Sequence, residues 1–442
     1  MSASSPLGGT ARSAASDLPV ICFLEFAQRL PDRNDPAKIG AANEDSSRMT
    51  TDGSQHEVEY RWVHIQYKED AAFVETYGFS GNQGAINLEG LLMTPKGRPS
   101  STLLVFMHPA STLQLLPVPQ ATVRAGAHVL CAASRYVKND TPLILEKVLL
   151  DLGAYIRHAK EQWGYKKIVI VGWSGGGALA LFYQSQAENP TITDTPAGDP
   201  VDVKGARLIP ADALVFQAAH ISRAQLLLDM LDPSVRDELD PDDRDRQLDI
   251  YDKANPNRPP YSADYIAEYR AAQLVRMRKI TTWVKETLTK LKARNTGEME
   301  RGFVTHRTLA EPRFLDPTLD PNDRKPGWCY LGNPETANTG PVGLARFSTL
   351  RSWLSQWSID DTNGNGLACA RHISVPLLAI ENSADDAVPQ PHTGAIFTAA
   401  GSQDKSMHVV KGGTHYYAGQ PDKLAEAVST VQNWLAARDL VP

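Results

Sequence analysis

The sequence predicts an α/β fold in which helices flank a mostly parallel, twisted sheet. Short and almost purely apolar runs recur along the chain, at residues 103–107, 128–131, 168–171, 214–216 and 377–380. Such runs are typical of strands that are buried on both faces. Helical patterns separate several of them, and strands that alternate with helices favour a parallel sheet. The alternation stops after Ala219 and resumes at Val375, which predicts a large, mainly helical cap insertion.

Other elements complete this sheet. Residues 59–67 alternate apolar and polar side chains, and residues 86–93 form a second extended run that ends at Pro95. Together they predict an antiparallel pair at the start of the sheet. Residues 142–163 carry apolar side chains at helical spacing, and residues 407–410 form the last predicted strand.

The insertion contains one long helical pattern. The helix is expected to begin after Ser262, whose hydroxyl is a good N-cap, and to end at Gly297. Residues 229–252 are rich in acids and residues 270–294 are rich in bases. Complementary packing of these two stretches is one alternative, but solvated faces are the more common outcome and are expected here.

Composition and charge describe an ordinary globular chain. Hydrophobic residues make up 42% and charged residues 22% of the sequence, and the formal net charge is -6. These values are typical of compact domains and give no attraction to a phosphate backbone, so nucleic acid is not an expected partner. No apolar run is long enough to span a membrane. The four cysteines lack a C-x-x-C pair or regular spacing, which favours a reducing compartment.

These patterns divide the chain into an N-terminal extension, a core in two parts and the insertion. The predicted segments are the partly disordered extension (1–55), the core (56–222 and 370–442) and the cap (223–369). The expected location is the cytoplasm. Residues 1–16 are rich in Ser and Ala and lack acids, which leaves an organelle transit peptide as a minor alternative. The sequence leaves open whether the chain forms a homo-oligomer.

One five-residue pattern carries chemistry. Residues 172–176 read G-W-S-G-G, directly after the predicted strand 168–171 and before an apolar helical segment. A nucleophile on such a strand-to-helix turn has a strained backbone, so small residues are needed at Gly172 and Gly176. A Gly-rich turn with an incidental serine is the alternative, and a phosphate loop is disfavoured because no Lys follows the glycines. The context favours Ser174 as a nucleophile.

This turn resembles the nucleophile turn of the α/β-hydrolase superfamily, whose members carry nucleophile, acid and histidine in that order. Residues 385–389 read D-D-A-V-P and resemble the family's acid turn, in which Asp385 matches the acid and Asp386 is the second choice. Residues 411–415 read K-G-G-T-H and resemble the histidine loop, so His415 is the expected base. The resemblance implies that His415 takes the proton of Ser174 while the carboxylate orients the imidazole.

The resemblance also implies an oxyanion hole. Its donors would be the backbone amides of Gly175 and of a residue in the loop after strand 103–107. Many family members carry His-Gly there, whereas this chain reads His108-Pro109-Ala110-Ser111. Proline has no amide hydrogen, so the position that matches the family's second donor is Ala110. Five further residues are candidates for contact with substrate: Trp173, His108, Ser111, His220 and Tyr416.

The function implied is hydrolysis of a carboxylic ester or lactone of a bulky apolar or aromatic small molecule through an acyl-enzyme. An amidase, a peptidase or a carbon–carbon bond hydrolase on the same scaffold is an alternative, and a ligand-binding member without turnover is another. Residues 361–366 match half of a calcium loop, but the twelfth position is His372 instead of the required Glu. No metal and no cofactor are therefore expected.

Overall fold

The computed structural model describes residues 55–69 and 85–440, which belong to one compact unit. The predicted N-terminal extension, with its disorder and its alternative as a transit peptide, lies outside the described residues except for residue 55. The boundaries predicted at residues 222/223 and 369/370 stay predictions. In the described part of the chain, no helix combines the length and the apolar character that a membrane span requires.

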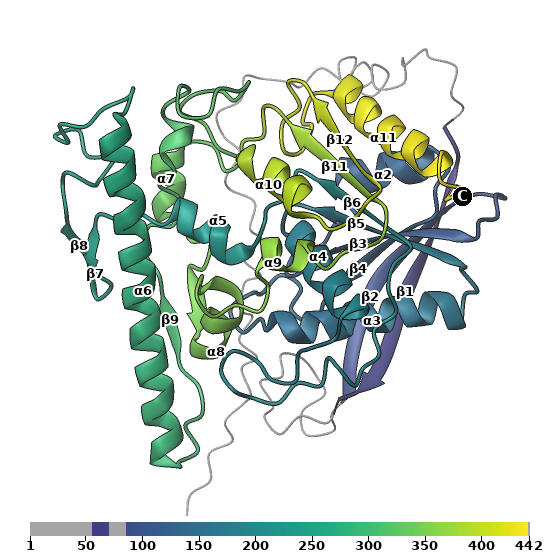
Figure 1. The fold of residues 1–442 in the computed structure, drawn as a ribbon, viewed down its shortest axis with the longest axis horizontal. Helices are drawn as coiled ribbons and strands as arrows, with labels where there is room; N and C mark the ends of the chain where they lie inside the picture. The colour runs from purple at the N-terminus through teal and green to yellow at the C-terminus, as the bar shows by residue number, and fades with distance from the viewer. Residues whose placement is uncertain (1–54, 70–84, 441–442) are drawn as a thin grey trace, which may run out of the picture. The chain divides into compact units, whose positions relative to one another are not determined.

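An eight-stranded sheet forms the centre of the structure, in the order β1-β2-β4-β3-β5-β6-β11-β12 (Figure 1). Strands β1 and β2 pair antiparallel, as predicted, and β2 also pairs antiparallel with β4. All pairs from β4 to β12 are parallel. The strands are β1 (Val58–Lys68), β2 (Ala85–Pro95), β3 (Thr102–His108), β4 (Val129–Ala133), β5 (Lys167–Trp173), β6 (Ala213–Gln217), β11 (Leu377–Asn382) and β12 (Lys405–Val410). This architecture confirms the predicted α/β-hydrolase fold.

Each central strand contributes side chains to two hydrophobic cores, because successive side chains point to opposite faces of a sheet. In β5, Ile168 and Ile170 lie in the core that also contains α3 (Leu145–Glu161) and α4 (Gly175–Glu188). Val169 and Val171 lie in the core that also contains α11 (Pro421–Ala436). Helix α2 (Pro117–Arg124) shares that second core, and α10 (Pro391–Ala399) shares the first. The apolar runs therefore mark strands that are covered on both faces.

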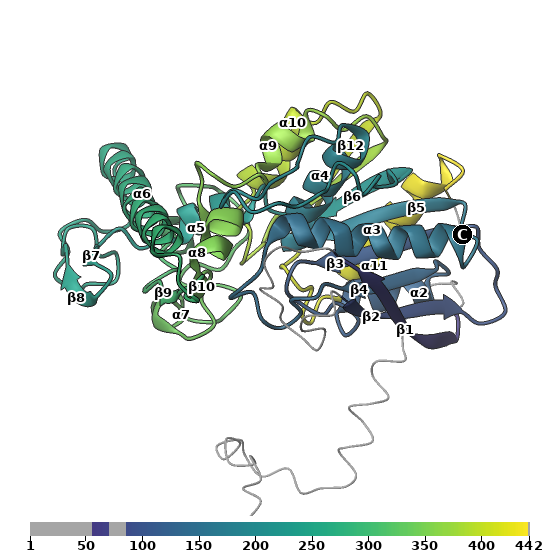
Figure 2. The same cartoon turned by 90° about the horizontal axis from the view of Figure 1, so that it is seen from below.

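The chain between β6 and β11 forms the insertion. Figures 1 and 2 show α6 (Ala263–Arg294) away from the sheet, with α5 (Arg223–Met230) and α8 (Leu350–Ser352) nearer to the sheet. Besides its helices, the insertion contains two small two-stranded sheets. Its other elements are β7 (Val235–Asp237), β8 (Asp240–Arg244), β9 (Gly302–Val304), η3 (Pro312–Phe314), α7 (Pro334–Thr339), β10 (Phe347–Thr349), η4 (Trp353–Trp357) and α9 (Gly366–Ala370).

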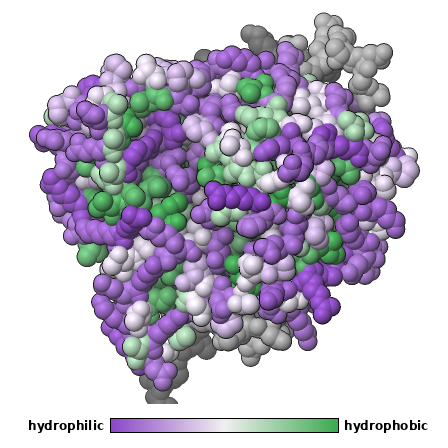
Figure 3. Space-filling view, in the orientation of Figure 1, coloured by the Kyte–Doolittle hydropathy of each residue, from purple (hydrophilic) through white to green (hydrophobic). Residues whose placement is uncertain are grey.

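Helix α6 begins as predicted, since the Ser262 hydroxyl accepts a hydrogen bond from the amide of Tyr265. Its predicted end at Gly297 is wrong. Asn295 adopts a left-handed conformation with φ 49° and caps the helix, because asparagine tolerates this backbone region better than most residues. The face drawn in Figure 3 is largely hydrophilic, with apolar side chains gathered at the left over the insertion.

The acid-rich and base-rich stretches do not only form solvated faces. The side chain of Arg276 in α6 is 3% exposed, and its guanidinium pairs with Glu238 at 2.7 Å. Arg270 donates to the carbonyl of Asp229 at 3.0 Å, whereas Arg278 pairs with Asp360 at the surface. The expectation of solvated faces is therefore wrong for part of this helix, because buried carbonyls and carboxylates give its arginines partners.

Candidate active site

Ser174 lies at a strained turn between β5 and α4. Its φ of 53° and ψ of -124° belong to a sparsely populated region for a residue with a side chain, and such strain persists only where the surroundings impose it. A Cβ at Gly172 would lie 2.7 Å from the Cα of Gly177, and one at Gly176 would lie 2.4 Å from the carbonyl oxygen of Met107. Glycine is therefore required on both sides of Ser174.

The loops after three parallel strands meet at the same edge of the sheet, because the carboxyl ends of parallel strands lie together. Ser174 follows β5, Asp385 follows β11 and His415 follows β12. Nδ1 of His415 lies 3.0 Å and 3.1 Å from the two carboxylate oxygens of Asp385. Both residues are buried, at 1% and 2% exposure. A carboxylate at this nitrogen holds the proton on Nδ1 and leaves Nε2 free to accept one.

The two neighbouring carboxylates have different surroundings. Oδ1 of Asp385 also accepts hydrogen bonds from the amides of Ala387 at 2.9 Å and Val388 at 2.7 Å, which stabilise its charge. Asp386 contacts the backbone of His415 instead of the ring, since its Oδ1 accepts from the amide at 3.3 Å. Burial and the charge of Asp385 raise the pKa of Asp386. The geometry therefore places Asp385, and not Asp386, against the imidazole.

His108, the last residue of β3, presents a second imidazole to the same space. Its Nδ1 accepts hydrogen bonds from the amides of Ala110 at 3.1 Å and Ser111 at 3.0 Å. The amide of Ala110, which the sequence predicts as the second oxyanion donor, is thus directed at the ring of His108 in this structure. A nitrogen that accepts two bonds carries no proton, so the proton of the neutral ring is on Nε2.

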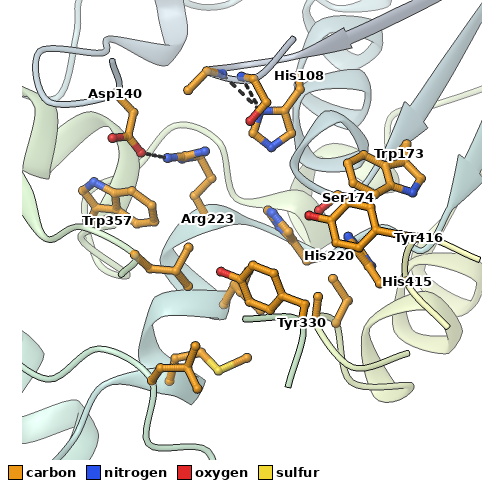
Figure 4. A pocket seen from close by; sticks show the side chains of 18 residues that line it. His108, Asp140, Trp173, Ser174, His220, Arg223, Tyr330, Trp357, His415 and Tyr416 are labelled. Carbon is orange, nitrogen blue, oxygen red and sulfur yellow. Dashed lines mark hydrogen bonds and ion pairs between the residues drawn. The ribbon is translucent and has the colours of Figure 1, made fainter. Parts of the chain in front are cut away.

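The ring of His108 lies against the start of α4. A Cβ at Gly175 would be 2.4 Å from Nε2 of His108, so the absence of a side chain there makes room for the imidazole. Burial lowers the pKa of His108 to about 3, and Arg223 and His415 act in the same direction. Figure 4 shows the free nitrogen of this ring pointing into the pocket, away from its own loop.

A cavity of about 190 Å³ joins these groups to the insertion. Eight of the predicted site residues line it: Ser174, His415, Trp173, His108, Ala110, Ser111, His220 and Tyr416. Gly175 and Asp385 lie next to it, at the start of α4 and behind His415. The ring of Trp173 lies 4.5 Å from that of His415, and Tyr416 meets the imidazole edge-on at 4.9 Å. These aromatic rings shield the base from water.

Other residues that line the cavity were not among the candidates from the sequence. They come mainly from the insertion: Arg223, Leu226, Met230, Leu309, Tyr330, Leu344 and Trp357. Asp140 joins them from the loop before α3 and pairs with Arg223 at 2.5 Å. No motif contains these residues. The aromatic content of the insertion was the only available signal, and it does not distinguish a cavity wall from a core.

The calcium-like stretch has structural partners in the protein. Asp361 pairs with Lys285 at 2.6 Å, the side-chain amide of Asn363 donates to Glu146 at 3.0 Å, and Asn365 caps α9. These side chains are directed at separate partners and do not converge on one point. Among the described residues, no cluster of three or more His, Cys, Asp or Glu could hold a metal ion.

Comparisons with known proteins add the following. No protein-family profile and no curated protein matches the chain. Solved structures similar to it include DcsB in complex with its substrate analogue (14% identity, TM-score 0.44, 86% of this chain and 99% of that chain). Others are the esterase domain of a Rhodothermus marinus protein (13%, 0.41, 85% and 98%) and a Paleococcus ferrophilus monoacylglycerol lipase (13%, 0.39, 79% and 98%). At such values the fold assignment rests on the strand order above.

Proposed function

We propose that this protein is a serine hydrolase that cleaves a carboxylic ester or lactone through an acyl-enzyme. One observation carries the proposal: Ser174, on a strained strand-to-helix turn, shares a cavity with an imidazole whose far nitrogen is held by a buried carboxylate. A serine hydroxyl is a poor nucleophile until a base takes its proton. His415, oriented by Asp385, is suited to that role.

In the proposed reaction the Ser174 oxygen attacks the carbonyl carbon while Nε2 of His415 takes the hydroxyl proton. The tetrahedral intermediate then expels the alcohol, which receives this proton from His415. Water, activated by the same imidazole, attacks the acyl-enzyme and releases the acid. The negative oxygen of each intermediate requires hydrogen-bond donors that are already in position.

We assign these donors to the backbone amide of Gly175 and Nε2–H of His108. The Gly175 amide belongs to the first turn of α4, where helix amides have no partner within the helix. The two amides that donate to Nδ1 of His108 fix the tautomer in which Nε2 is a donor. Its low pKa keeps this ring neutral and therefore unable to act as an acid at ordinary pH.

Turnover of p-nitrophenyl esters of graded size tests the proposal. The purified protein should release p-nitrophenol with an initial burst equal to the enzyme concentration, and Ser174→Ala should abolish the burst and the turnover. Persistent turnover in the variant would remove Ser174 from the reaction. Matched p-nitroanilides distinguish the alternative activity, since equal turnover of amides would assign an amidase instead.

A further inference from the structure

The cavity contains a buried cation that the protein satisfies only in part. Arg223 is the first residue of α5, and its side chain is 6% exposed. Its guanidinium lies 4.3 Å from the centre of the Trp357 ring, and one terminal nitrogen donates to Asp140 at 2.5 Å. Nε of Arg223 is buried without a hydrogen-bond partner. Figure 4 shows this group on the side of the pocket opposite Ser174.

A guanidinium has five N–H donors, and Asp140 is the only acceptor that Arg223 contacts among the described residues. Buried polar groups almost always have partners, and a buried charge is costly unless it is both paired and hydrogen-bonded. The Asp140 side chain is 38% exposed, so water weakens its attraction. Burial lowers the pKa of Arg223, although Asp140 acts in the opposite direction. The cation is therefore not fully compensated by the protein.

A second unpartnered group lies beside it. His220 is 3% exposed, and its Nδ1 has no partner in the described part of the chain. Burial, and to a smaller extent the nearby His392, lowers the pKa of His220 well below the ordinary value, so the ring is neutral. In Figure 4 its imidazole lies between Arg223 and Ser174. Among the described residues that line the cavity, Asp140 is the single carboxylate, so the guanidinium and the unpartnered nitrogen of His220 meet only one negative charge there.

This shortage of negative charge around the guanidinium indicates which kind of ligand the cavity can bind. Arginine presents parallel N–H groups that match the two oxygens of a carboxylate. The cavity lining also includes apolar side chains such as Leu226 and Leu344, which suit a hydrocarbon segment. We propose that the substrate is an ester that also carries a carboxylate, which binds Arg223 while its scissile carbonyl lies at Ser174. This inference rests on the proposed function and narrows its substrate class.

Matched pairs of acidic and neutral esters test the inference. The first series sets the mono-p-nitrophenyl esters of succinate, glutarate and adipate against the mixed methyl p-nitrophenyl diesters of the same acids, with p-nitrophenol release as the readout. The second pair sets 4-acetoxybenzoate against its methyl ester, which moves the carboxylate to the alcohol side. Arg223→Met should lower kcat/KM for the preferred acidic ester by about 10- to 100-fold, as expected for a lost charge-assisted hydrogen bond. It should change the neutral partner by less than about threefold.

Two further variants sharpen this test. Asp140→Asn removes the competing carboxylate, so the preference for acidic over neutral esters should rise. Arg278→Met, a surface arginine of the same insertion, is the matched control and should leave the preference unchanged. An equal loss on acidic and neutral esters in Arg223→Met would overturn the carboxylate site.

A binding measurement separates this inference from the proposed function. Glutarate should raise the Tm of the Ser174→Ala variant, and it should not raise the Tm of the Ser174→Ala/Arg223→Met double variant. Glutaramide, which has the same length without the charge, is the control. Binding that depends on Arg223 without any esterase activity would support the carboxylate site and remove the proposed reaction. Ester turnover without such binding, and without a preference for acidic esters, would support the proposed reaction and overturn the carboxylate site.

Discussion

The loop after β12 and the loop after β3 each present an imidazole to the cavity beside Ser174, but with opposite electrostatics. Nδ1 of His415 faces the carboxylate of Asp385 at 3.0 Å, whereas Nδ1 of His108 faces two backbone amides at 3.0–3.1 Å. A carboxylate fixes a proton on Nδ1 and frees Nε2 as an acceptor, and two amide donors do the reverse. The neighbour at Nδ1 thus makes one ring suited to act as a base and the other as a donor.

The largest effect should follow from changing the neighbour of His415. Asp385→Asn keeps the shape of the side chain but removes the charge that holds the proton on Nδ1. Because the wrong tautomer then faces Ser174, kcat for p-nitrophenyl esters should fall about 10⁴-fold. Circular dichroism serves as the control for folding. A fall of less than tenfold in a folded variant would show that Asp385 does not orient the base.

A smaller loss is expected when His108 becomes Phe, which keeps a ring of similar size but removes Nε2–H. Loss of one oxyanion donor should lower kcat by about 10²- to 10³-fold with little change in KM. Because burial lowers the pKa of His108 to about 3, the ratio of wild-type to variant kcat should be constant between about pH 5 and pH 9. A ratio that varies across this range would indicate that His108 titrates and acts as an acid or base.

Gly175→Ala should disturb the donor ring without removing any backbone donor. The new methyl group would lie 2.4 Å from Nε2 of His108, so the imidazole must move and kcat should fall by about tenfold, as for other small misplacements at a reacting centre. The effect should largely disappear in a His108→Ala background. In a double-mutant cycle the coupling should then reach about 1 kcal/mol or more. Strict additivity would contradict the contact.

The smallest effect is expected at Asp386, the neighbour of the proposed acid. Asp386→Asn retains an oxygen that can accept from the amide of His415, so kcat should change by less than about fivefold, in line with about 1 kcal/mol for one hydrogen bond. This variant is the matched control for Asp385→Asn in the same assay. A larger loss at Asp386 than at Asp385 would reverse the assignment of the acid.

The core of the fold could be predicted from the sequence because its rules are local. All eight strands of the sheet lie where the sequence patterns place them. Burial on both faces of the central strands leaves a direct trace in composition, and burial on one face of β1 leaves an alternating pattern. Ser174, Asp385 and His415 each follow a predicted strand, and the family resemblance supplied the order of these three residues along the chain. Their catalytic roles are proposals, but their convergence could be anticipated from the parallel sheet.

The insertion and the loop after β3 were less predictable, since their arrangement depends on tertiary contacts. Arg223 contacts Asp140, which lies far from it in sequence, and Trp357, and no short motif encodes such contacts. The ring of His108 bends back over its own loop, which alters the use of the Ala110 amide. A sequence motif that resembles the family's second donor gives no information on the conformation of the His108 side chain.

Labelling with a fluorophosphonate probe tests the central claim most directly. The intact mass of the wild-type protein should increase by one probe adduct, and peptide mapping should place it on Ser174. Labelling should be slow in Asp385→Asn and absent in Ser174→Ala. An adduct that persists in Ser174→Ala, or that maps to another residue of the wild-type protein, would contradict the assignment of Ser174 as the activated nucleophile.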